Sequence, residues 1–270
     1  MDISIIEIFG FAASIAIGVA LGLIGGGGSI LTVPVLVYLF YIDPVMATAY
    51  SLFIVGLTSA VGSFNYFRQG LVNTKTAIVF GIPSIIAVSL TRAFIVPAIP
   101  YHVFSVGEFV VTKGILLMIL FAVLMIAASY SMIKKSKKIV QTEPVEQKFN
   151  YPLIVVEGAM VGALTGLVGA GGGFLIIPAL VILSKLHMKE AVGTSLVIIA
   201  LKSLIGFFCE GGVTEMDWTL LSLVSAFAIL GIFIGTALSK KIDGGKLKPA
   251  FGWFVLVMGI YIIVKETLLK

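Results

Sequence analysis

Long apolar stretches separated by short polar breaks dominate this chain. A helix needs about 20 mostly apolar residues to cross the hydrocarbon core of a bilayer, and several of the stretches reach that length. We predict five apolar helical segments in each half. In the first half they are 3–24, 29–41, 45–67, 76–98 and 111–133. In the second half they are 152–169, 173–184, 190–209, 217–239 and 248–266.

The second segment of each half, 29–41 or 173–184, is too short to cross a bilayer comfortably on its own. Each of these short segments begins directly after a run of glycines. We therefore predict that the first two segments of each half form a helical hairpin whose turn lies inside the membrane.

An internal repeat relates the two halves. The motif Gly22–Pro34 returns 144 positions later as Gly166–Pro178, and the same register holds at six further positions. Those positions are Ala47, Ser51, Leu52, Leu57, Ser59 and Gly62, which fall on Ala191, Ser195, Leu196, Leu201, Ser203 and Gly206. A duplicated glycine break within apolar segments is typical of transporters whose binding site lies between two internal repeats.

Composition supports a membrane protein. The chain is 59% hydrophobic and 11% charged, with a mean hydropathy of +1.16, whereas soluble domains carry about 25% charged residues. We predict an all-α polytopic membrane protein of two inverted repeats, whose glycine-rich broken helices or hairpins meet near the bilayer midplane. The first repeat is 1–133, a polar cytoplasmic linker is 134–150, and the second repeat is 151–270.

The distribution of Lys and Arg gives the orientation, because short cytoplasmic loops are enriched in these residues. Placing the lysine-rich linker 134–150 inside puts most Lys and Arg loops in the cytoplasm and both termini outside, in the plasma membrane of a prokaryote. Lys265 and Lys270 run against this assignment. If the short segments 29–41 and 173–184 each crossed the membrane, the repeats would instead be parallel.

Several functional classes find no support in the sequence. Basic residues do not form a stripe interleaved with aromatics, so we expect no nucleic-acid binding. Cys209 is the only cysteine, and neither His102 nor His187 has a metal-like partner nearby in the sequence, so we expect no metal and no cofactor. An intramembrane enzyme would need a nucleophile–base pair or paired carboxylates, which the apolar segments lack.

The glycine runs are the leading candidate for a binding site. A helix N-terminus exposes unpaired N–H groups and carries roughly half a positive charge, so two such termini face to face would hold an anion. Ser29 is suited to cap its helix and donate its hydroxyl. The alternative is that the glycines only permit close helix packing. The candidate backbone residues are Gly25, Gly26, Gly27, Gly28, Gly169, Gly171, Gly172 and Gly173.

Paired glycine-rich segments closed by Pro34 and Pro178, in a chain of this length, resemble the sulfite exporter TauE/SafE family, also called the toluene-sulfonate uptake permease family. The resemblance covers essentially the whole chain. It implies transport of a sulfur-containing or small organic anion, such as sulfite or a sulfonate, without selecting one of them.

Two cationic side chains fall within apolar segments, where charges are rare and usually functional. Lys202 lies about 12 residues in from Lys189, and Thr58 is its repeat counterpart, so we expect Lys202 to neutralise an anion. The alternative is a lysine that snorkels to the interface. Arg92 is open to two interpretations, as a bidentate anion ligand or as an arginine that snorkels to the outer surface.

Hydroxyl groups add weaker candidates. Ser51 and Ser195 match in register and Thr194 adjoins the latter, so their hydroxyls either face the site or bond to neighbouring helices. Glu157 is either a proton-coupling group or an interfacial carboxylate.

These features favour a secondary transporter that binds a small anionic substrate and moves it outward by alternating access. The interior-negative potential supplies about 2.3 kcal/mol per charge per 100 mV for anion export, whereas uptake needs a coupled ion such as a proton. An anion channel, or a permease for an organic anion without sulfur, remains the alternative. The oligomeric state is left open.

Overall fold

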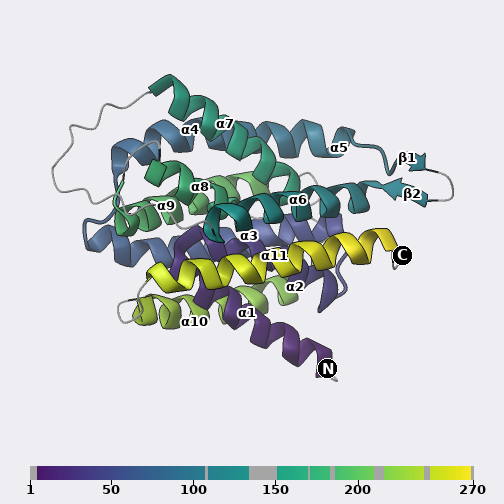
Figure 1. Ribbon diagram of the computed structural model, residues 1–270, viewed down its shortest axis with the longest axis horizontal. Helices are drawn as coiled ribbons and strands as arrows, with labels where there is room; N and C mark the ends of the chain where they lie inside the picture. The colour runs from purple at the N-terminus through teal and green to yellow at the C-terminus, as the bar shows by residue number, and fades with distance from the viewer. Residues whose placement is uncertain are drawn as a thin grey trace.

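The computed structural model describes residues 5–106, 109–133, 151–169, 171–182, 186–209, 216–239 and 244–268, and is mostly helical (Figure 1). The first half holds α1 (Ile5–Ile24), the 3-10 helix η1 (Gly25–Leu31), α2 (Thr32–Tyr38), α3 (Pro44–Arg68), α4 (Thr74–Leu90), the π-helix η2 (Thr91–Ile95), α5 (Val96–Ala98), β1 (His102–Val106), β2 (Phe109–Thr112) and α6 (Lys113–Ile133). The second half holds α7 (Tyr151–Val168), α8 (Gly173–Ile182), α9 (Met188–Phe208), α10 (Trp218–Ser239) and α11 (Gly244–Leu268). The predicted linker 134–150 lies outside the described residues.

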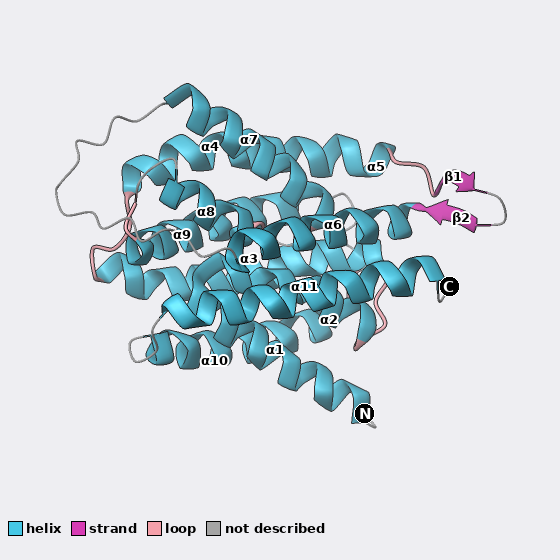
Figure 2. Cartoon of the chain, in the orientation of Figure 1, coloured by secondary structure: helices cyan, strands magenta, loops and turns pink. Residues whose placement is uncertain are grey.

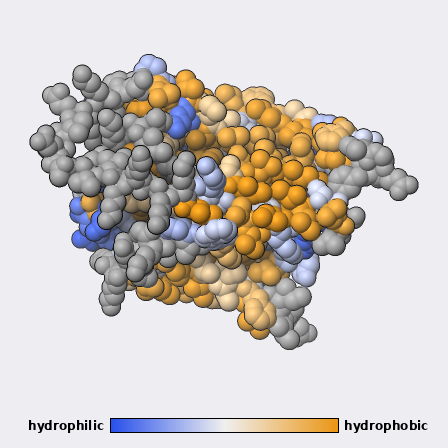
Figure 3. Space-filling model, viewed as in Figure 1, coloured by the Kyte–Doolittle hydropathy of each residue, from blue (hydrophilic) through white to orange (hydrophobic). Residues whose placement is uncertain are grey.

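The outer surface of this fold is apolar. On α4, every fourth residue from Ile78 through Ile82 and Ile86 to Leu90 is exposed, which is the stripe expected of a helix that faces lipid. Apolar residues also cover most of the described surface in Figure 3, with the most hydrophilic residues near its left end. By length and composition, six described stretches could cross a membrane: Ile8–Tyr38, Pro44–Arg68, Thr74–Ala98, Lys113–Tyr130, Met188–Phe208 and Trp218–Ser239. The protein is therefore an all-α polytopic membrane protein.

The first of those stretches does not run straight. Phe40, two residues beyond the end of α2, packs its ring against that of Phe11 near the start of α1, with 5.4 Å between centroids. Near the turn, Gly28 in η1 lies against the backbone of Leu21 in α1. The chain thus enters through α1, reverses in η1 and returns through α2, which confirms that these two segments form a hairpin.

The second hairpin follows from its packing. Gly158 and Gly166 on α7 contact Phe80 on α4 and Thr91 at the start of η2 respectively, so α7 runs parallel to α4 from the end where α4 begins. Gly193, near the start of α9, contacts Leu71, which lies just before α4. Because α7 and α9 begin at the same end of the molecule, α8 must bring the chain back, and the second predicted hairpin is also confirmed.

Each hairpin packs against a helix from the opposite half. α1 lies along α10 and α7 lies along α4, in both cases through glycines that leave no room for a side chain. A Cβ on Gly18 would collide with the carbonyl oxygen of Ala228, and one on Gly162 would collide with that of Ser84. Gly18 and Gly162 are 144 positions apart, and so are Ser84 and Ala228, so the two interfaces are equivalent in the repeat. Small residues that let backbones approach are the usual glue between membrane helices.

Helix boundaries repeat at the same offset of 144 positions. α1 and α7 end at equivalent residues, while α3 and α9, and α4 and α10, begin at equivalent residues. The three pairs are Ile24 and Val168, Pro44 and Met188, and Thr74 and Trp218. The sequence repeat therefore marks a repeat of secondary structure.

Both ends of the described chain lie at the same end of the molecule, at the right of Figure 1. α6 ends and α7 begins at the opposite end. An antiparallel hairpin of β1 and β2, in which His102 pairs with Thr112 and Val106 with Phe109, projects at the right (Figure 2). We did not expect these strands, because the apolar segment was predicted to begin at 111. Their Val- and Phe-rich composition is that of a β-hairpin.

Candidate functional site

The two glycine turns share an unusual backbone conformation. Gly25 and Gly169, which are 144 positions apart, both have a φ of 72°. In the second turn Gly171 and Gly172 follow with φ of 62° and 65°. Residues with a side chain rarely adopt this left-handed region, so these positions need glycine. We call Gly25–Gly28 the first glycine turn and 169–173 the second, in which residue 170 lies outside the described residues.

The first glycine turn corrects one expectation. Its glycines form the start of η1 and are not an irregular break, because 3-10 bonds keep their backbone groups paired. Ser29 lies inside η1 and donates its hydroxyl to the carbonyl oxygen of Gly26 at 2.7 Å. It therefore does not cap α2, since the hydroxyl is already bonded three residues back. In the second turn, α8 begins at Gly173 as expected.

The two turns touch backbone to backbone at Gly26 and Gly173. A Cβ on either glycine would collide with the main chain of the other. Backbone atoms thus fill the point at which the sequence predicted an open niche, and the glycines do serve close packing here. A ligand held by both turns at this point requires them to separate.

α3 and α9 pass along the turns on both sides of this contact. Thr48 on α3 lies against Gly169, and Val192 on α9, its counterpart in the repeat, lies against Gly25. Further along α9, the Oγ of Ser203 faces Gly171 and the Nζ of Lys202 faces Gly172. The turns therefore present their backbone to polar side chains of α9.

Lys202 is fully buried at 0% exposure, which excludes the snorkelling alternative. Its Nζ donates to the Oγ1 of Thr165 on α7 at 3.1 Å, and that hydroxyl donates to the carbonyl oxygen of Gly162 at 3.1 Å. An ammonium group carries three N–H donors, and a single hydroxyl accepts one of them. A buried cation with this partner is costly unless an anion joins it.

Arg92 is also fully buried, at 0% exposure, so it does not snorkel to the surface. It belongs to η2, a π-turn at the end of α4. Its neighbour Thr91 packs against Gly166, which lies one turn before Gly169. η2 therefore packs against α7 one turn before the second glycine turn, and π-turns of this kind occur frequently at functional sites.

The structure separates the predicted hydroxyl residues. Thr194 accepts a hydrogen bond from the backbone N–H of Asn73 at 2.9 Å, at the end of the molecule where α4 begins. Ser195 donates to the carbonyl oxygen of Val192 within α9 at 2.8 Å. The Oγ of Ser51 is buried and has no hydrogen-bond partner among the described residues. Of these three, Ser51 alone has a hydroxyl without a hydrogen-bond partner among the described residues.

Two polar residues at the site were not among our candidates. Thr165 holds Lys202, and Ser203 is fully buried with no hydrogen-bond partner for its Oγ among the described residues. The register match between Ser59 and Ser203 could have identified the second, since both hydroxyls are buried and lack partners in the described part. Thr165 has no such signal, because its counterpart is Leu21.

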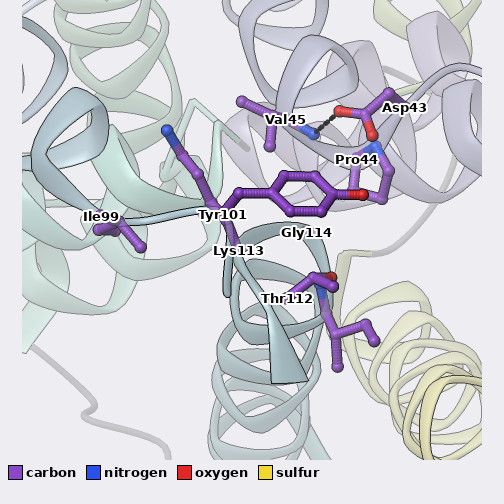
Figure 4. Close-up of a pocket in the computed structure, with 9 residues that line it drawn as sticks. Asp43, Pro44, Val45, Ile99, Tyr101, Thr112, Lys113 and Gly114 are labelled. Carbon is purple, nitrogen blue, oxygen red and sulfur yellow. Dashed lines mark hydrogen bonds between the residues drawn. The ribbon is translucent and has the colours of Figure 1, made fainter. Parts of the chain in front are cut away.

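A cavity of about 580 Å³ lies away from the glycine turns, where α3, the end of α5 and the start of α6 meet (Figure 4). Its lining residues are Asp43, Pro44, Val45, Ile99, Tyr101, Thr112, Lys113, Gly114 and Ile115. The carboxylate of Asp43 accepts from the N–H of Val45 at 2.8 Å and so caps α3. The cavity is therefore not at the glycine turns. We still take the turns as the better candidate site, because the buried Lys202 on α9 lies beside them.

A family comparison covers nearly the whole chain. The model of the family described as Sulfite exporter TauE/SafE matches residues 10–262. No solved structure shows significant similarity to the chain.

Curated relatives are similar over almost their full length. A protein of Xylella fastidiosa is 28% identical over 92% of this chain and 91% of its own. YunE of Bacillus subtilis is 27% identical over 97% and 98%, and MJ0441 of Methanocaldococcus jannaschii is 28% identical over 92% of each chain. All three are named as probable membrane transporter proteins.

The contact between the turns generates a stability prediction. Replacing Gly26 with alanine forces a Cβ into the backbone of Gly173, so Gly26→Ala should lower the free energy of unfolding by about 1–3 kcal/mol. Gly81→Ala is the matched control, because its new Cβ would meet only Ile198, at 3.8 Å. Thermal denaturation of the two variants in detergent compares them. Equal denaturation midpoints for the two variants would contradict the contact between Gly26 and Gly173.

Proposed function

The chain belongs to the sulfite exporter TauE/SafE family, and we propose that it is a secondary transporter for a small sulfur-containing anion that binds at Lys202. That it is a multi-pass membrane transporter follows from the family and from its relatives.

One observation carries the proposal: a buried lysine whose ammonium donates one hydrogen bond to Thr165 among the described residues. Removing a charge from water without a counter-charge costs several kcal/mol, so a site of this kind is built for an anionic partner. Lys202 lies on α9 near the point where Gly56 of α3 packs against Leu204. An anion bound there touches both crossing helices.

The surroundings of Lys202 supply further donors for an oxyanion. The Oγ of Ser203 faces the same glycine turn, and the first turn of α8 begins at Gly173. Hydroxyls and helix N-terminal N–H groups are suitable partners for oxygen atoms that carry negative charge. Arg92 adds a second buried positive charge near the end of α7. These groups favour a sulfite- or sulfonate-like substrate, in agreement with the family description.

Export is the favoured direction. An interior-negative membrane potential drives an anion outward with about 2.3 kcal/mol per charge per 100 mV, so export needs no coupled ion. Uptake would need one, and Glu157, half-buried on α7, is our candidate for proton coupling.

We propose that residues 1–133 and 151–270 are inverted repeats joined by a cytoplasmic linker at 134–150. Three features support this: the helix boundaries that repeat 144 positions apart, the exchange of hairpins between halves, and the opposite ends at which α1 and α7 begin. In such a protein, alternating access moves one repeat against the other around a fixed site. The contact between Gly26 and Gly173 then belongs to a closed form.

The charge distribution supports a cytoplasmic position for the end where α6 stops and α7 starts. Arg68 at the end of α3 and Lys75 at the start of α4 lie at that same end. Cytoplasmic loops carry an excess of such residues. The termini then face outward. The relatives come from bacteria and an archaeon, which supports a prokaryotic plasma membrane.

Transport of sulfite and organosulfonates in proteoliposomes tests the function. The protein should show saturable flux that is accelerated by substrate on the opposite side, and Lys202→Ala should lower it at least tenfold, because one charge-assisted contact is worth about 1.5–3 kcal/mol. Lys189→Ala, which removes an exposed lysine from the same helix, should leave flux unchanged.

Two results would change the proposal. Flux that does not saturate and ignores substrate on the other side would identify a channel. A lack of flux for every sulfur anion would overturn the substrate class.

Cysteine labelling tests the orientation. In a Cys209→Ser background, Tyr101→Cys should react with an impermeant thiol reagent in intact cells, because the β-hairpin end faces outward. Gln69→Cys, also exposed but at the opposite end, should react only after permeabilisation. The reverse pattern would place the linker outside.

A further inference from the structure

One hydrogen bond ties the start of α4 to the opposite half. The backbone N–H of Asn73 donates to the Oγ1 of Thr194 on α9 at 2.9 Å. Asn73 is also the N-cap of α4, since its Oδ1 accepts from the N–H of Thr76 at 3.0 Å. Its Nδ2 donates to the carboxylate of Glu190, one turn before Thr194, at 3.3 Å. We call the bond between Asn73 and Thr194 the first gate contact.

A second hydrogen bond ties the start of α10 to the first half. The backbone N–H of Asp217 donates to the phenolic oxygen of Tyr50 on α3 at 2.6 Å. Asp217 is the N-cap of α10, because its Oδ1 accepts from the N–H groups of Thr219 and Leu220 at 3.0 Å. We call the bond between Asp217 and Tyr50 the second gate contact.

The two contacts are equivalent positions of the repeat. Asn73 and Asp217 are 144 positions apart, and so are Tyr50 and Thr194. In each case an N-cap residue of one half donates its main-chain N–H to a side chain that lies seven residues into the crossing helix of the other half. The two side chains differ, a phenol in one contact and a threonine hydroxyl in the other. Both accept the main-chain N–H of an N-cap residue, so the hydrogen bond is the feature that the two contacts share.

The contacts lie at opposite ends of the molecule. Thr194 lies near the start of α9 and Tyr50 near the start of α3, and these two helices run antiparallel. Each contact has local support at its own end: Glu190 at the first, and at the second the ring of Phe53, which packs 5.9 Å from that of Trp218. Both Tyr50 and Thr194 are buried.

We propose that Tyr50 and Thr194 are gate residues, each of which holds one end of the protein closed. This inference rests on the alternating access in the proposed function. Each bond joins the two halves, so movement of one half against the other must break the bond at the end that opens. Both bonds are formed here, as is the contact between Gly26 and Gly173, and the structure is therefore closed at both ends.

If Tyr50 and Thr194 are gate residues, removing one hydroxyl should open one end and removing the other should open the opposite end. A purely structural role does not predict this difference. A neutral hydrogen bond contributes about 0.5–1.5 kcal/mol, so removing one gate contact should favour opening at its own end by about two- to tenfold. Tyr50→Phe removes only the phenolic oxygen, and Thr194→Val keeps the side-chain shape. Opening should shift toward one end in the first variant and toward the other end in the second.

Two buried alanines at equivalent positions serve as reporters. Ala47 and Ala191 are both 0% exposed and lie one turn before Tyr50 and Thr194. Ala47→Cys or Ala191→Cys is introduced separately into the full chain carrying Cys209→Ser. The labelling rate with membrane-permeant N-ethylmaleimide is then measured in proteoliposomes, where vesicle orientation does not affect access.

Tyr50→Phe should raise the labelling rate at position 47 by about two- to tenfold without raising it at position 191. Thr194→Val should do the opposite. Thr194→Ser retains the hydroxyl and should label like the parent protein. Ser63→Ala is the matched control, because that hydroxyl bonds to Ala60 within α3 and should move neither reporter.

Two outcomes would overturn the gates. One is a higher labelling rate at both positions 47 and 191 in either variant, which would indicate a general loosening of the helix packing. The other is no change at either reporter while sulfite counterflow persists in the same vesicles. Reciprocal shifts without flux of any sulfur anion would support the gates and remove the proposed substrate, so the two proposals fail separately.

Discussion

A backbone surrounded by lipid must satisfy its own polar groups, and that requirement governs the centre of this fold. The chain reverses direction twice within the helical bundle, and each reversal uses glycines whose main-chain groups stay in helical or turn geometry. Because neither Gly26 nor Gly173 has a side chain, the two reversals can touch. α9, which carries Lys202, packs beside that contact, because Ile199 lies against Gly26.

The halves are also incomplete without each other. α1 packs along α10 and α7 along α4, so each hairpin uses a helix of the other half as its main neighbour. The glycines at these interfaces bring helix axes close enough for main-chain contact, and little else would hold apolar helices together in an apolar solvent. The bond from Lys202 on α9 to Thr165 on α7, by contrast, lies within the second half.

Much of this arrangement could be predicted because membrane length and glycine runs constrain a sequence strongly. The hairpins, most helix boundaries and the burial of Lys202 follow from those two signals. Ser29 was misjudged because a serine beside a helix start looks the same whether it caps the helix or bonds back to Gly26. The β-hairpin escaped notice because it is only a few residues long. Thr165 and the partners of Thr194 depend on contacts between distant segments, which the sequence pattern does not contain.

The two ends of the molecule are not chemically the same, although the repeat relates them. A phenol closes one end and a threonine hydroxyl the other, and the β-hairpin stands beside only the former in the described chain. Identical inverted halves would open to either side at equal free energy. With unequal ends, the resting protein favours one face, and substrate saturates the two faces at different concentrations. Microscopic reversibility still holds, so this bias sets the speed of each half-cycle, whereas the gradients alone set the direction of net flow.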